Sequence, residues 1–164
     1  MKTIDIKLDL NEVVYDIQNK TYLTGKSRRD GDNHEQVANM QANDDDENAN
    51  QVLRSVSMAF SNLKMKLGEY LDLNHSTANN ELMDSDTELN LTLKMPSNFN
   101  NATVDTVAAA AHQYVVSRAI FDWFVITDKK DAEEYATLAD QSLKIISEAV
   151  SKRSRPQRVV KPKA

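Results

Sequence analysis

The sequence predicts a mainly helical α+β protein, with a body of four helices, two short β-strands and extended polar arms. Three observations support this class. Long stretches carry apolar residues three and four positions apart, as amphipathic helices do. Two short stretches alternate apolar and polar residues, which is typical of half-buried strands. The segments between them are polar and rich in Asp and Asn. At 164 residues, the chain is long enough for one domain with a real core.

The N-terminal region predicts a strand followed by a short helix. Residues 3–10 alternate strictly, and Ile4 and Ile6 lie on the apolar side. Residues 12–23 then carry apolar side chains at helical spacing, after Asn11 as a capping residue and before a glycine that would end the helix at position 25. The apolar side of the strand needs a partner, so Ile4 and Ile6 are candidate subunit contacts.

Residues 26–43 predict a flexible arm, because they are polar and exceed the length of a normal connection. The next apolar pattern predicts a long helix over residues 48–71, with acidic residues before its positive end. Residues 88–95 alternate like the first strand, and Leu89 and Leu91 lie on their apolar side. Leu89 and Leu91 are therefore also candidate subunit contacts. The two strands could pair within one chain or between chains.

The C-terminal part of the body, residues 101–150, predicts two long helices joined at Thr127 and Asp128. The short link favours an antiparallel pair, and Asp128 is a good N-cap for the second helix. The first helix becomes apolar nearly all round, so other elements must cover it. Arg118 and Asp122 lie four residues apart on it and predict an ion pair, with a contact between subunits as the alternative.

The second of these helices places its apolar residues on one face. We expect this face to point inward against the first helix of the pair. Its members are Ala132, Tyr135, Leu138, Ala139, Ser142, Ile145, Ile146 and Ala149.

Charge is distributed unevenly between the body and the C-terminus. Residues 152–164 contain six basic residues and no acid, so the remaining 14 basic residues face 25 acids and the body carries about −11. We therefore divide the chain into a helical domain, 1–151, and a basic tail, 152–164. The tail predicts contact either with DNA phosphates or with an acidic protein surface, including the next copy of this chain. Its basic residues are Lys152, Arg153, Arg155, Arg158, Lys161 and Lys163.

No residue pattern predicts catalysis, a cofactor or a metal site, so we expect a protein that is not an enzyme. The Thr-Gly-Lys-Ser stretch at residues 24–27 lacks the earlier glycine and the leading strand of a phosphate-binding loop. The three histidines are scattered, and the absence of cysteine excludes disulfides and thiolate metal sites. No apolar run is long enough for a membrane span.

The order of elements resembles that of head-to-tail connector (adaptor or neck ring) proteins of tailed bacteriophages. Three features carry the resemblance: the short helix 12–23 ending in Thr24-Gly25, the long helix 48–71, and the closing pair. In that pair, residues 121–124 (Phe-Asp-Trp-Phe) lead into the helix 131–152. The lack of cysteine and the Asn- and Asp-rich loops are similar to virion proteins of phages that infect Bacteroidetes, including crAss-like phages.

The resemblance implies a structural virion protein. Such a protein would be assembled in the cytoplasm of the host bacterium and would form a homo-oligomeric ring at the neck. Its partners would be the portal and other neck or tail proteins, with non-specific contact to the genomic DNA that it guides. The alternative, from the residues alone, is a small DNA-associated or regulatory protein that binds phosphate through its basic tail.

Overall fold

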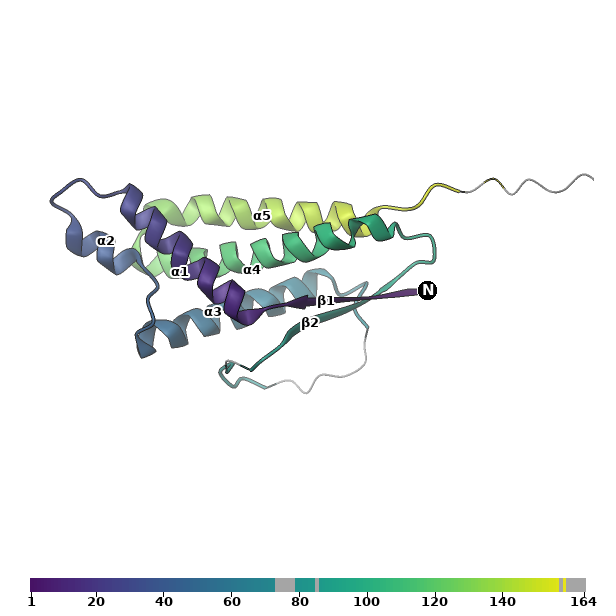
Figure 1. The fold of residues 1–164 in the computed structure, drawn as a ribbon, viewed down its shortest axis with the longest axis horizontal. Helices are drawn as coiled ribbons and strands as arrows, with labels where there is room; N and C mark the ends of the chain where they lie inside the picture. The colour runs from purple at the N-terminus through teal and green to yellow at the C-terminus, as the bar shows by residue number, and fades with distance from the viewer. Residues whose placement is uncertain (73–78, 85, 157, 159–164) are drawn as a thin grey trace, which may run out of the picture.

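The computed structural model describes residues 1–72, 79–84, 86–156 and 158. Helices dominate this part of the chain, and one two-stranded antiparallel sheet accompanies them (Figure 1), so the predicted α+β class is confirmed. The described residues form five α-helices, one more than the sequence predicted. The elements are β1 (Lys2–Leu8), α1 (Leu10–Ser27), α2 (His34–Met40), α3 (Asp46–Lys66), β2 (Leu89–Met95), the 3-10 turn η1 (Asn101–Thr103), α4 (Val104–Thr127) and α5 (Lys129–Ser151).

Helix α4 is the centre of the molecule. It contacts α1, α2, α3, α5 and β1, and Figure 1 shows it between α5 and α3 with α1 crossing in front. Contrary to the prediction, the end of α4 is not covered on all sides, since Val125 and Ile126 are exposed. The rest of the helix fits the apolar pattern of the sequence. Val115, Val116, Ile120 and Phe124 are accordingly inaccessible to solvent.

Helices α4 and α5 form the antiparallel pair that the sequence predicted. The Asp128 side chain caps α5 by accepting a hydrogen bond from the Lys130 backbone N–H, at 3.0 Å. The rings of Phe124 and Tyr135 meet across the pair, with their centroids 5.4 Å apart. The predicted inward face of α5 is only partly right, because Leu138 and Ile145 lie on its solvent side.

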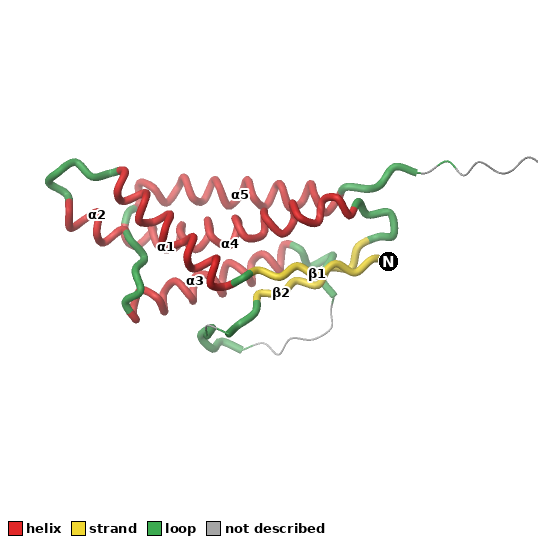
Figure 2. Tube along the Cα trace, in the orientation of Figure 1, coloured by secondary structure: helices red, strands yellow, loops and turns green. Residues whose placement is uncertain are grey.

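Strands β1 and β2 pair with each other, in a register from Lys2 opposite Met95 to Leu8 opposite Leu89 (Figure 2). The pairing left open by the sequence is therefore within the chain. The far edge of β2 is also occupied, since Lys94 N–H donates to the Tyr70 carbonyl at 2.6 Å. Leu71 forms an isolated bridge to β2, which explains why α3 ends at Lys66 although the apolar pattern continues to residue 71.

The start of α1 differs from the prediction. β1 stops at Leu8, and Leu10 is a buried helical residue rather than the last strand residue. The cap is Asp9, whose carboxylate accepts the Asn11 backbone N–H at 2.9 Å. Asn11 is therefore inside the helix and does not cap it.

The prediction that residues 26–43 form a flexible arm is wrong in this structure. Helix α1 continues to Ser27, and α2 then folds over the end of the bundle. Met40 and Ala42 are buried. The Trp123 indole N–H donates to the Met40 carbonyl at 2.8 Å. The segment packs mainly against α1, where the Ala42 backbone N–H donates to the Thr21 hydroxyl, and the contact with Trp123 on α4 adds to this stabilisation.

Gly25, predicted as a helix stop, is a helical residue in close contact with α2. A Cβ atom at this position would lie 3.0 Å from the Val37 carbonyl oxygen. The glycine therefore allows α1 and α2 to approach each other and does not end the helix.

Candidate functional site

The basic tail begins where α5 ends. Ser154 N–H donates to the Asn98 carbonyl at 2.7 Å, and Arg153 forms an isolated β-bridge with Phe99. These contacts hold the root of the tail against the loop that precedes α4, an arrangement that residue spacing did not indicate. The described part then extends past the end of the bundle where the N-terminus also lies (Figure 1).

The predicted tail contacts are exposed where the structure describes them. Lys152, Arg153, Arg155 and Arg158 lie on the surface, and no ion pair involves any of them within the described residues. The Arg153 guanidinium donates only to backbone carbonyls, those of Val150 and Lys152. The remaining two predicted contacts, Lys161 and Lys163, lie outside the described residues.

The predicted subunit contacts on the strands face the interior of the same chain. Ile6, Leu89 and Leu91 are buried in the core, so they are not available to a second subunit in this structure. Ile4 is partly buried beside that core. The apolar faces of the two strands therefore find their partner within the chain, mainly against α4.

Arg118 and Asp122 lie near each other on α4, with Arg118 Nε 3.9 Å from the nearer Asp122 carboxylate oxygen. This distance is too long for a hydrogen bond. The Arg118 guanidinium lies over the Phe121 ring, 4.8 Å from its centroid. Its Nε is buried without a hydrogen-bond partner among the described residues. Burial raises the pKa of Asp122, and the positive charge of Arg118 partly offsets this effect.

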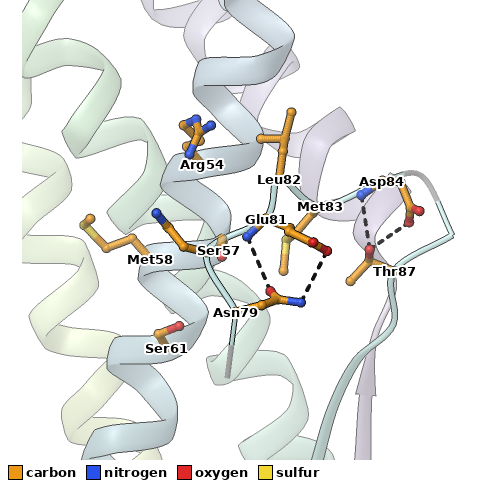
Figure 3. Close-up of a pocket in the computed structure, with 11 residues that line it drawn as sticks. Arg54, Ser57, Met58, Ser61, Asn79, Glu81, Leu82, Met83, Asp84 and Thr87 are labelled. Carbon is orange, nitrogen blue, oxygen red and sulfur yellow. Dashed lines mark hydrogen bonds between the residues drawn. The ribbon is translucent and has the colours of Figure 1, made fainter. Parts of the chain in front are cut away.

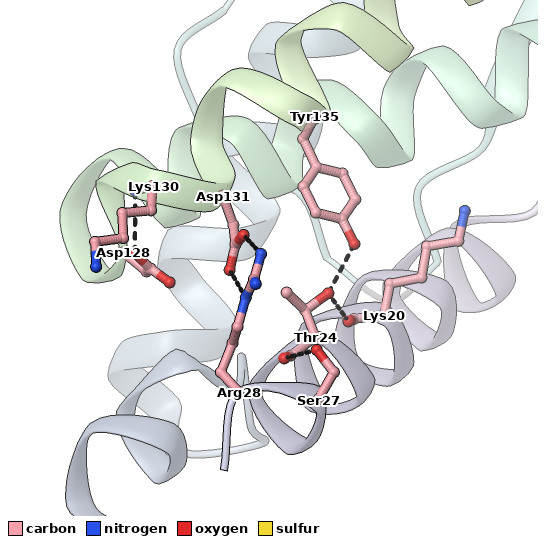
Figure 4. Close-up of polar contacts among 8 residues, drawn as sticks. All are labelled: Lys20, Thr24, Ser27, Arg28, Asp128, Lys130, Asp131 and Tyr135. Carbon is pink, nitrogen blue, oxygen red and sulfur yellow. Dashed lines mark hydrogen bonds and ion pairs between the residues drawn. The ribbon is translucent and has the colours of Figure 1, made fainter. Parts of the chain in front are cut away.

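A polar cluster joins α1 to the beginning of α5 (Figure 4). Arg28 donates to both carboxylate oxygens of Asp131, with Nε 3.2 Å from one of them. Next to it, the hydroxyl groups of Thr24 and Tyr135 are 2.9 Å apart. The Asp131 side chain is only 2% exposed. The hydrogen bonds from Arg28 hold the pKa of Asp131 below its ordinary value, although burial acts in the opposite direction.

A hollow of about 820 Å³ adjoins this cluster, at the end of the bundle opposite the tail. Five of its lining side chains are carboxylates and two are basic, which gives a formal charge of −3. We call this feature the acidic hollow. Its carboxylates are Asp30, Asp128, Asp131, Glu133 and Glu134, and its basic residues are Arg28 and Lys130.

A second cavity, of about 600 Å³, lies between α3 and residues 79–87 (Figure 3). Its polar contacts on the loop side are local ones. Thr87 Oγ1 donates to the Asp84 carboxylate at 2.8 Å, and the Glu81 backbone N–H donates to Asn79 at 3.4 Å. Arg54 and Met58 line the helix side. The hydroxyl–carboxylate contact of Thr87 with Asp84 joins residues three positions apart, as local turn contacts do, so we assign the cavity no chemistry.

A titratable pair outside these cavities connects two packed helices. His112 Nε2 is 2.6 Å from an Asp16 carboxylate oxygen, which links α4 to α1 across 96 positions in the sequence. The scattered histidines gave no sign of this pair. The Thr-Gly-Lys-Ser stretch, residues 24–27, belongs to α1. Within the described ranges, no group of three or more His, Cys, Asp or Glu side chains could hold a metal ion.

Several large apolar side chains lie on the outside of the bundle. On each of three helices, two of them are seven residues apart, which places them on the same helix face. Val125 and Ile126 at the end of α4 are exposed as well. The three pairs are Tyr15 and Tyr22 on α1, Met58 and Met65 on α3, and Leu138 and Ile145 on α5.

Comparisons with protein-family models, with curated proteins and with solved structures give no match for this chain. In the part of the chain that the structure describes, none of the helices combines the length and apolarity needed to span a bilayer.

Proposed function

We propose that this chain is a structural subunit of a phage neck, forming a homo-oligomeric ring that docks on the portal and guides DNA passage. In this proposal the protein is not an enzyme. The resemblance in the order of helices supports it. The surface supports it too, because apolar residues remain exposed on four helices and a cationic segment projects from a body that closes its own core.

The observation that carries the proposal is the charge layout. The body is strongly acidic, and the basic tail leaves it at one end, where Ser154 contacts the Asn98 carbonyl. A tail of this kind can reach a neighbouring protein without disturbing the fold of the body. An acidic wall also suits a DNA conduit, because it repels the sliding duplex and does not trap it.

Electron microscopy and native mass measurement test the proposal on the full chain, alone and mixed with its portal protein. We expect cyclic particles whose mass is a multiple of the subunit mass. Removal of residues 155–164 should impair docking while it leaves the Ser154 contact with Asn98 in place. A single-subunit mass under both conditions would refute the proposal.

The second candidate is sequence-independent binding of DNA through the tail. The absence of any acid among residues 152–164 favours it. If all six cations contact phosphates, log K should fall with log salt with a slope of about −5. Gel shifts of a duplex at low and moderate salt measure this slope. A duplex that remains unshifted at low salt, or one that the shortened chain shifts equally well, would eliminate this candidate.

A further inference from the structure

We propose that the basic tail of one copy docks in the acidic hollow of the next copy, so that copies associate end to end. This inference rests on the proposed function in one respect, since it names the surfaces by which a homo-oligomer would form. It concerns two features that the structure places at opposite ends of the same bundle (Figure 1).

The acidic hollow offers unpaired negative charge to a cationic partner. Arg28 already neutralises Asp131. Glu133 and Glu134 are exposed and form no ion pair among the described residues. Val37 and Met40 contribute apolar surface to the same hollow. Long basic side chains can pack their methylene groups on such a surface while their charged ends meet carboxylates.

The tail is complementary in charge and in length. Ser154 holds the root of the tail, and four of the residues 155–164 that follow it are basic. An extended chain covers about 3.3 Å per residue, so these ten residues span at most about 33 Å. That length suits a shallow hollow lined by side chains from two segments, residues 28–40 and 127–134.

The tail of a chain can hardly occupy the acidic hollow of that same chain. Asp131 and Lys152 stand near the two ends of α5, 21 residues apart, which corresponds to about 32 Å of helix. A tail folded back from Ser154 would have to run this whole length in a fully extended conformation before it reached the hollow. A second copy placed beyond the end of the first brings tail and hollow together without this cost.

The predicted contact joins two different surfaces of identical chains, so it is heterologous. Repetition of such a contact closes into a ring if the rotation between copies permits and otherwise gives an open filament. Because the attraction is between exposed charges, it should weaken as salt is added.

Charge reversal in the full-length protein tests the inference. The hollow variant carries Glu133→Lys and Glu134→Lys, which changes the formal charge of the hollow from −3 to +1. The control variant carries Glu69→Lys and Glu148→Lys, which makes the same change in net charge at exposed positions outside the hollow. The tail variant reverses all four basic residues beyond Ser154, namely Arg155, Arg158, Lys161 and Lys163.

Sedimentation velocity at low and high salt provides the measurement, and circular dichroism verifies that each variant is folded. We expect the wild type and the control to self-associate at low salt, and the hollow and tail variants to be monomeric when alone. A mixture of these two variants should associate again, because the intact tail of the hollow variant meets the intact hollow of the tail variant, and the two charge-reversed surfaces are complementary as well.

Four results would overturn the inference. These are a monomeric wild type at low salt, a hollow variant that associates like the control, a mixture that stays monomeric, and association that requires added duplex DNA. A ring with the portal that forms equally well with the hollow variant would refute end-to-end docking and leave the proposed function standing. Salt-sensitive association of the wild type without any portal complex would support end-to-end docking and refute the proposed function.

Discussion

Truncation of Phe124 tests the central position of α4. Phe124 is 0% exposed and its ring meets that of Tyr135, whereas Ile126, two residues further on, is 68% exposed. Replacement of a buried Phe by Ala costs about 3–5 kcal/mol through lost transfer energy and the cavity left behind. We place Phe124→Ala in the upper part of that range, because the aromatic contact is lost as well.

The expected change is large enough to measure. For a chain of this size, each kcal/mol shifts the unfolding midpoint by about 2–4 °C, so Phe124→Ala should lower it by roughly 8–20 °C. Phe124→Leu should cost much less, since most of the volume is kept. Ile126→Ala should change stability by about 0.5 kcal/mol or less.

Thermal unfolding followed by circular dichroism at low protein concentration compares the three variants. The reasoning about α4 would be refuted if Phe124→Ala melted within about 2 °C of the wild type, or if Ile126→Ala were equally damaging. The second result would mean that the exposed end of α4 is covered by something in solution.

Two further predictions concern contacts between distant segments. Arg28→Met should lower the melting midpoint at neutral pH more than Asp131→Asn, because it leaves a buried carboxylate without its partner. Because the pKa of Asp131 is lowered in the folded protein, its ionised carboxylate stabilises the fold above the ordinary aspartate pKa, and this contribution is lost as the pH falls through the folded-state pKa. The difference in melting midpoint between the wild type and Arg28→Met should therefore shrink in acid. Trp123→Phe removes the donor to the Met40 carbonyl and should speed hydrogen exchange and proteolysis in residues 28–43; protection equal to that of the wild type would contradict this.

Local sequence patterns were sufficient to predict a helix or strand where the residues of that element alone indicate its structure. The link at Asp128 predicted the α4–α5 pair, and the alternation at Ile6 and Leu91 predicted both strands. Patterns also predicted that α4 must be covered on all sides, which is right for most of the helix and wrong at its end, where Val125 and Ile126 are exposed. They did not identify what covers it, because α1, α3 and the sheet approach α4 from distant positions in the sequence.

The errors have a common physical cause, which is stabilisation from outside the local sequence. Residues 26–43 look unstructured because Val37 and Met40 are their only sizeable apolar residues, yet Trp123 supplies the missing partner. Gly25 was interpreted from its conformational freedom, whereas its role is to give space to the Val37 carbonyl.

The two candidate binding surfaces, the basic tail and the acidic hollow, also differ in how far the sequence predicted them. The composition of the tail was visible in the sequence, and its exposed position agrees with that composition. The acidic hollow was not predicted, since its carboxylates come from the α1–α2 loop and from the beginning of α5, which are separated by about a hundred positions. Only the fold brings Asp30 close to Glu133 and Glu134.

The late position of α4 in the sequence has a consequence for biosynthesis. α1, α3 and β1 all bury their apolar faces against a helix that ends at Thr127, and β1 also needs β2, which starts at Leu89. While the ribosome is still making the first hundred residues, the nascent chain lacks α4, which is the surface against which these faces close. The N-terminal half must therefore wait, with its apolar residues in water or on a chaperone, until the central helix is translated.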